Sequence, residues 1–371
     1  MIAADRRPGV VIRTVVVVAQ SLHAVIQELA AMFRLLTLSI VVGIGTLSAN
    51  AAEPVTRVDE SAVRKAVEQS IPFVERQGAG WIVRKKCVSC HQIPAMVWSL
   101  NAAAKRGFDI DAKRLKQWNE WATNWQNFSA SKKKEELKEE GTASSNVDTI
   151  YQLLLARDDY AADDQTQLRL AAFAKHLAKA QTADGSWTPR GQLPTQRRPA
   201  RETREVTTMW SLLTLNEADI DDTEWTKKRE EATTFLSTAA NAKSTEWWAV
   251  KLLLDNQGSD TKTLDRTRKQ LITTQHEDGG WGWLSADGSD AFGTGLAIYS
   301  LCQSGLKSDD PVIARACNFL LKSQQKNGSW KVNGTKKNAA NRVVPTATYW
   351  GTCWAVIGLL ETLETTADKA E

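Results

Sequence analysis

A motif of the form Gln-x3-Gly-x-Trp occurs three times along this chain and limits the folds it can adopt. The copies span Gln181–Trp187, Gln275–Trp281 and Gln324–Trp330, and each follows an amphipathic run and precedes a more apolar one. Recurrence of this kind is typical of repeat architectures, in which each repeat is one supersecondary unit. The motif Trp residues are 94 and 49 positions apart, so we expect the longer gap to hold one further unit whose motif has been lost near Asn241–Ser244. The chain has 15 Trp but only 4 Tyr, which fits a repeated packing role for Trp.

The apolar pattern around the motifs predicts six helical hairpins. The first helix of each hairpin is amphipathic and is expected outside, over residues 58–76, 111–128, 163–181, 222–239, 262–275 and 309–325. The second is more apolar and is expected inside, over residues 94–106, 146–157, 203–215, 244–255, 290–304 and 346–363. Each hairpin buries only one face against its neighbours, so an open array would need capping repeats, whereas a closed ring would not. We therefore predict an all-α fold, an α/α6 toroid with an inner and an outer ring of helices, forming a single domain over residues 52–371.

The motifs and the apolar helices that follow them carry a family resemblance. With DAFGTGLAIYSL at 290–301 and PTATYWGTCWAVIGLL at 345–360, the chain resembles the terpenoid cyclase and protein prenyltransferase superfamily, in particular the C-terminal repeats of squalene-hopene cyclases. The resemblance covers 163–363 by motif and 58–157 by helix periodicity alone. It implies a toroid in which the motif Gln and Trp side chains tie the end of one outer helix to its neighbour. That structural role would fall to Gln181, Trp187, Gln275, Trp281, Gln324 and Trp330.

The catalytic residues of this superfamily are not matched. A class II cyclase protonates an alkene with an Asp-x-Asp-Asp motif at the start of an inner helix, but the same letters at Asp219–Asp222 precede a charged outer helix, where Asp is an ordinary N-terminal cap. A prenyltransferase needs an Asp/Cys/His zinc set, and Cys302, Cys317 and Cys353 lie in predicted helices without His at ligand spacing. The resemblance therefore predicts a fold and leaves the activity open.

Chemistry is concentrated in the first repeat, at Cys87-Val-Ser-Cys90-His91. Cys-x-x-Cys-His is the attachment motif of c-type haem. Two thiols at this spacing reach the two vinyl groups of one porphyrin, and the adjacent His91 is placed to bind the iron as proximal ligand. The other interpretations are a thioredoxin-like redox pair, half of a zinc site, and a structural disulfide between Cys87 and Cys90. We predict one covalent haem c.

The position of this motif places the haem at one mouth of the toroid. The attachment loop, residues 81–96, lies where the other repeats have the loop after their Trp, and Gln77–Trp81 resembles a decayed copy of the repeat motif. An open sixth position on the iron is one expectation, because no distal ligand stands out. Three residues could supply that ligand from this repeat or another: Met96, Met209 and His276.

The N-terminal residues predict export. Arg34, an apolar run over 35–47 and Ala49-Asn50-Ala51 form a signal peptide at 32–51 with cleavage near Ala51. An apolar run this short does not span a hydrocarbon core of ~30 Å, so we expect no membrane span in the mature form and a periplasmic or secreted location. Residues 1–31 precede a complete signal, and we interpret them as a start codon assigned too early.

Charge and composition narrow the function classes. The 47 Lys and Arg against 43 Asp and Glu are mixed along the chain, so no basic stripe predicts nucleic-acid binding. We predict periplasmic electron transfer or haem redox chemistry, with a redox partner protein. One alternative is an enzyme that uses the toroid cavity for an apolar, isoprenoid-like ligand, and another is a binding scaffold without turnover. Whether an open pocket exists depends on four inner-helix aromatics: Trp210, Trp247, Phe292 and Trp350.

Overall fold

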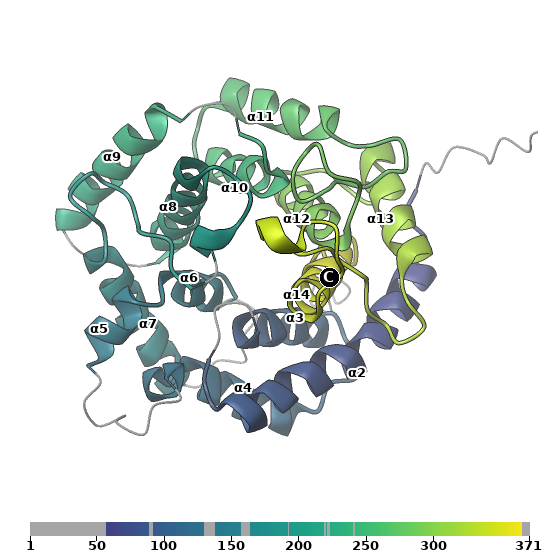
Figure 1. Cartoon of the computed structure of the whole chain (residues 1–371), viewed down its shortest axis with the longest axis horizontal. Coiled ribbons are helices and arrows are strands. Elements are labelled where there is room, and N and C mark those ends of the chain that lie inside the picture. Colours follow the sequence, from purple (N-terminus) through teal and green to yellow (C-terminus); the bar gives the residue numbers. More distant parts are fainter. Residues whose placement is uncertain are drawn as a thin grey trace, which may run out of the picture. The chain divides into compact units, whose positions relative to one another are not determined.

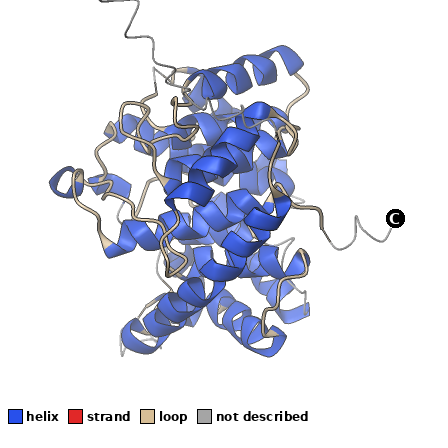
Figure 2. Ribbon diagram, turned by 90° about the vertical axis from the view of Figure 1, so that its right-hand side faces the viewer, coloured by secondary structure: helices blue, strands red, loops and turns tan. Residues whose placement is uncertain are grey.

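The computed structural model describes residues 57–88, 92–129, 138–156, 164–191, 193–218, 220, 223–239 and 242–365. Val55–Glu371 forms one compact unit, and Met1–Pro54 is assigned to another. The predicted signal peptide at 32–51 lies outside the described residues. Within the described part the regular structure is helical, and β-pairing is limited to isolated bridges between loops (Figure 2). None of the described helices combines the length and the apolar character needed to cross a membrane.

Two concentric rings of helices make up this unit (Figure 1). The outer helices are α2 (Glu60–Lys85), α4 (Ala112–Thr123), α7 (Asp164–Lys179), α9 (Thr223–Ser237), α11 (Thr261–Thr273) and α13 (Pro311–Ser323). The inner helices are α3 (Ile93–Lys105), α6 (Val147–Leu155), α8 (Ala200–Glu217), α10 (Thr245–Asn256), α12 (Ala291–Gln303) and α14 (Pro345–Leu360). A short helix, α5 (Glu139–Ser144), precedes α6, and 3-10 turns occur at η1 (Trp125–Phe128), η4 (Leu193–Thr195) and η5 (Lys337–Ala339). The predicted toroid and its helix pairs are confirmed.

The inner ring is closed. Each inner helix packs on the next in the order α3, α6, α8, α10, α12, α14, and α14 packs back on α3. The outer ring closes where α13 meets α2. At this junction the Gln324 side chain donates to the Ala66 carbonyl at 2.8 Å, across 258 positions of sequence. Closure therefore removes the exposed apolar end faces that an open array would have.

The motif Gln side chains join neighbouring outer helices, as the resemblance implies. Gln181 donates to the Lys228 carbonyl of α9 at 2.7 Å, and Gln275 donates to the Val312 carbonyl of α13 at 2.9 Å. Each also donates to the carbonyl of the motif Gly four residues on, at 2.9 Å. One amide thus fixes both the turn after its own helix and the start of the next outer helix.

The motif Trp side chains act differently from the prediction. Each indole donates back to its own outer helix, ten residues earlier, as Trp187 does to Leu177 at 2.7 Å. Trp281 and Trp330 repeat this contact, at 3.0 and 2.8 Å. The backbone N–H of Trp187 donates to Thr208 Oγ1 on inner helix α8 at 3.1 Å. The chain reverses tightly at the motif Gly, which brings the indole back beneath its own helix. The prediction that Trp ties neighbouring outer helices together is therefore wrong for its hydrogen bond.

The prediction of a decayed motif at Gln77–Trp81 is also wrong. These residues lie inside α2, which continues to Lys85 and ends at Lys86 in a left-handed conformation with φ 53°. The buried stripe of α2 ends at Gly78. Beyond it, Trp81 and Ile82 are partly buried against the core, so the helix keeps apolar contacts towards its last turn. A side chain at Gly78 would overlap Met96 of α3, and glycine there lets the first hairpin close.

Aromatic side chains fill the centre of the toroid. Trp98 packs edge-on against Trp354 with ring centroids 5.2 Å apart, and Trp210 stacks on Tyr151 at 6.0 Å. Trp210 and Trp247 are buried in this core, at 2% and 7% exposure. The four side chains in these ring contacts therefore leave no room for a ligand between them.

Candidate functional site at one mouth of the toroid

The two helices of each hairpin run in opposite directions, so the described parts of the loops that lead from an outer to an inner helix lie at the same end of the toroid. We call this end the motif face. It carries the loop between α2 and α3, which contains Cys87, and the loops after the three Gln-x3-Gly-x-Trp motifs. The predicted attachment loop at 81–96 is shorter in the structure, because residues 81–85 belong to α2 and 93–96 to α3, so that 86–92 connect the two helices.

Hydrogen bonds hold the attachment loop on both sides. The Trp81 indole donates to the Cys87 carbonyl at 3.0 Å, and the Val88 N–H donates to the Asn127 carbonyl at 2.7 Å. On the other side, the buried Tyr349 hydroxyl of α14 donates to the Gln92 carbonyl at 3.1 Å. Cys90 and His91 lie outside the described residues.

The surroundings of Cys87 are apolar and basic. Cys87 is a free, half-buried thiol at the end of the exposed basic run Arg84–Lys86. Val83, four residues earlier, is 73% exposed and is one of the few large apolar side chains left in solvent within the described part. Apolar surface beside positive charge suits a porphyrin, whose ring is apolar and whose propionates are anionic. These features of Cys87 are compatible with the predicted haem attachment, whose other two residues lie outside the described part of the chain.

Of the three candidate distal ligands, only Met96 lies next to this loop, and all three are engaged elsewhere. Met96 is fully buried in the first turn of α3 against Gly78, and Met209 is fully buried in α8, which is not a ring neighbour of α3. Both ring nitrogens of His276 are engaged, Nδ1 with Ser289 Oγ at 3.0 Å and Nε2 with the Ser285 carbonyl at 3.2 Å. A distal role for any of the three would require it to leave these partners.

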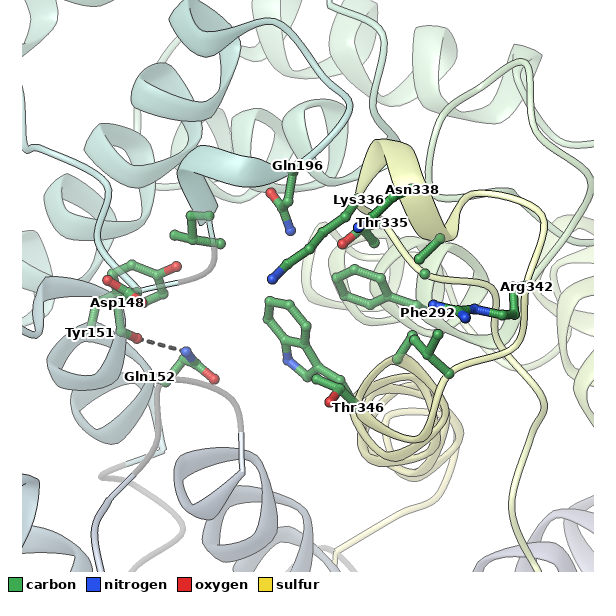
Figure 3. A pocket seen from close by; sticks show the side chains of 16 residues that line it. Asp148, Tyr151, Gln152, Gln196, Phe292, Thr335, Lys336, Asn338, Arg342 and Thr346 are labelled. Atoms are coloured by element: carbon green, nitrogen blue, oxygen red, sulfur yellow. Dashed lines mark hydrogen bonds between the residues drawn. The ribbon is translucent and has the colours of Figure 1, made fainter. Parts of the chain in front are cut away.

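A cavity of about 220 Å³ opens on the motif face (Figure 3). One wall comes from α6 and includes Asp148, and the opposite wall is formed by Phe292 of α12 and Trp350 of α14. Loop residues complete it, with Gln196 and Lys336 pointing into the space. A hydrogen bond joins the loop between α7 and α8 to the loop between α13 and α14, since the Arg197 N–H donates to the Thr335 carbonyl at 2.8 Å. Of the four aromatics that sequence singles out, Phe292 and Trp350 line the cavity.

Asp148 is the most perturbed group at this cavity. It lies in the first turn of α6, 2% exposed, and its Oδ1 has no hydrogen-bond partner. Burial raises the pKa of Asp148 from 3.8 to about 6, although the backbone N–H and the charge of Arg190 act in the opposite direction. A buried carboxyl that faces a cavity is a frequent functional group. Sequence reasoning did not single out Asp148; the available signal was one acidic residue in the first turn of an apolar inner helix.

The pKa of Asp148 predicts a pH-dependent effect of Asp148→Asn. Because the folded state raises this pKa, the proton is held more tightly in the folded chain, and the free energy of unfolding falls as pH rises from 3.8 to about 6. Above that range the wild type carries the full penalty of a buried charge, which asparagine lacks. We expect Asp148→Asn to stabilise the fold by about 2–3 kcal/mol at pH ~8 and to change it little at pH ~4, measured by urea unfolding.

Asp290 provides the matched comparison for this prediction. Burial also raises its pKa to about 6, but its two carboxylate oxygens accept the N–H groups of Gly293 at 2.8 Å and Trp283 at 2.9 Å. An amide cannot accept at both positions, so Asp290→Asn is expected to destabilise the start of α12. Equal behaviour of the two variants at pH ~8 would contradict the role given to desolvation at Asp148.

Comparison with known proteins supports the fold but does not identify an activity. Residues 253–371, the last third of the chain, match the family described as the squalene-hopene cyclase C-terminal domain. This match supports the superfamily resemblance for the final repeats. No curated protein matches the sequence.

Solved structures extend the likeness over most of the chain. Unsaturated glucuronyl hydrolase from Bacillus sp. GL1 has a TM-score of 0.52 at 11% identity and covers 80% of this chain and 96% of its own. A glycosyl hydrolase family 88 protein from Bacteroides vulgatus has a TM-score of 0.51 at 13% identity, with coverages of 80% and 98%. At these identities the likeness shows the fold alone.

Proposed function

We propose that this chain is an exported c-type haem protein, with Cys87 and Cys90 as covalent anchors and His91 as the proximal iron ligand. The observation that carries the proposal is the Cys-x-x-Cys-His sequence in a loop whose flanks are fixed at the mouth of a rigid toroid. The predicted signal peptide at 32–51 supports it, since a secreted or periplasmic location is where c-type haem is attached. Electron transfer with a redox partner protein, or haem redox chemistry, follows as the proposed activity.

The residues around the motif have distinct tasks in this proposal. Cys87 and Cys90 would hold the porphyrin through two thioether bonds, and His91 would ligate the iron. Trp81 and Tyr349 hold the backbone on either side of the two anchors. Exposed Arg84–Lys86 offers positive charge to the propionates. When bound, the haem supplies one-electron chemistry.

The sixth iron position distinguishes an electron carrier from a ligand-binding haem protein. Met96, Met209 and His276 are each buried or hydrogen-bonded elsewhere. An open sixth position is therefore the version of the proposal that requires no rearrangement of the toroid. It would allow small ligands to reach the iron from the motif face.

Covalent attachment gives the proposal a direct test. The protein is exported from a host with cytochrome c maturation, denatured, and its intact mass measured. We expect the mass of the processed chain plus one haem, loss of that addition in Cys87→Ala/Cys90→Ala, and its retention in Cys302→Ala, a control thiol on inner helix α12. An unmodified mass for folded, exported wild type would overturn the haem assignment.

A further inference from the structure

The cavity on the motif face contains buried polar groups without partners. Asp148 Oδ1 and Gln196 Oε1 are both inaccessible to solvent and accept no hydrogen bond. Both residues line the cavity, from α6 and from the loop after η4 respectively (Figure 3). Buried acceptors are almost always satisfied in folded proteins, so this space calls for an occupant that brings N–H or O–H donors.

The opposite wall is aromatic. Phe292 and Trp350 stack with ring centroids 4.8 Å apart and an interplanar angle of 26°. Both line the cavity, whereas Trp210 and Trp247 are packed into the core below. A ligand that fits between this wall and Asp148 needs one apolar face and an edge that carries donors.

The positive side chains near the cavity limit which hydrogen-bond donors a ligand can carry. Lys336 points into the cavity and Arg342 lines it, and the charge of Arg190 acts on Asp148. Three positive side chains around one small space disfavour a cationic ligand. The donors are therefore uncharged, as hydroxyl groups are, and the polar lining also argues against an isoprenoid, which would leave Asp148 and Gln196 unpaired.

We propose that this cavity binds a hydroxyl-rich ring of monosaccharide size, with its C–H groups against the stacked pair of Phe292 and Trp350 and its hydroxyls donating to Asp148 and Gln196. The volume of about 220 Å³ is below the ~300–1,000 Å³ of most ligand pockets and suits one such ring. This site goes beyond the haem proposal and does not depend on it, because none of its residues belongs to the attachment motif.

Saturation-transfer NMR tests the site with defined probes. The full exported protein is mixed in turn with D-glucose, D-xylose, myo-inositol and farnesol. We expect transfer to at least one of the three polyhydroxylated rings and none to farnesol. Gln196→Met keeps the length of the side chain and removes its polar atoms, and it should weaken that binding about tenfold, the cost of one hydrogen bond.

Gln126→Met is the matched control, since Gln126 is exposed in η1 and does not line the cavity. It should bind like the wild type, and thermal unfolding of both variants checks that the fold is retained. The proposal is overturned by no transfer to any of the three rings, by transfer to farnesol alone, or by equal affinity in the two variants. The haem content of the same samples is read separately, so failure of one proposal leaves the other measurable.

Discussion

Replacing Gly328 by alanine should lower the free energy of unfolding by about 2–5 kcal/mol. Gly328 has φ +81°, a conformation that costs an L-residue about 1–2 kcal/mol. A Cβ at this position would also overlap the Gln69 carbonyl of α2, which adds a packing cost of about 1–3 kcal/mol. The loss is large because Gly328 lies where α13 meets α2, the junction that closes the outer ring.

Gly305 allows the conformational cost to be measured without the packing cost. It has φ +105°, but a Cβ there meets no atom within 4 Å. Gly305→Ala should therefore cost about 1–2 kcal/mol, the conformational part alone. Urea unfolding of both variants, followed by circular dichroism, gives the comparison. Equal losses would show that the close approach of α2 to the last motif has no energetic weight, and would remove the physical reason given for a closed outer ring.

Breaking the buried ion pair between Arg198 and Glu246 should be comparably severe. Arg198 Nη1 lies 2.6 Å from Glu246 Oε2, with side-chain exposures of 0% and 4%, and Glu246 also accepts from the Trp210 indole at 3.2 Å. Glu246→Leu leaves the Arg198 guanidinium buried without its counter-charge. Such a charge costs about 3–5 kcal/mol, so the variant should unfold at markedly lower urea concentration than the wild type.

A second substitution tests the origin of that loss. In Arg198→Met/Glu246→Leu no charge is left unpaired, and we expect most of the lost stability to return. The surface control is Glu120→Gln, where the partner Lys116 is 3.9 Å away and both side chains are largely exposed; it should cost less than about 1 kcal/mol. A double variant as unstable as Glu246→Leu would mean that packing, and not the buried charge, accounts for the effect.

The fold could be predicted because each repeat has its own sequence pattern. Each amphipathic outer helix and apolar inner helix shows its own periodicity, and Gln-x3-Gly-x-Trp marks the turn between them. The bond from Gln324 to Ala66 across the ring junction repeats the bond from Gln181 to Lys228, so ring closure follows from the same rule as every other step. The first repeat is the exception, because Gln77–Trp81 resembles the motif but lies inside α2, where the helix continues to Lys85.

The candidate site was less accessible to sequence reasoning, because residues from distant repeats form it. The haem motif is contiguous and could be read directly, and the aromatic wall was half found, as Phe292 and Trp350 but not Trp210 and Trp247 line the cavity. Gln196 and Asp148 carry no local pattern. They come together only when loops from the third and sixth repeats meet over α6, a contact that no periodicity reports.

The most direct test of the haem assignment is the reduced pyridine haemochrome spectrum of the protein exported from a host with cytochrome c maturation. We expect a c-type spectrum, which indicates that both vinyl groups are saturated, and its complete loss in Cys87→Ala/Cys90→Ala. The native ferric spectrum should be high-spin, since Met96, Met209 and His276 are engaged elsewhere. A folded, exported protein without haem would contradict the assignment and leave the polar cavity on the motif face as the functional site.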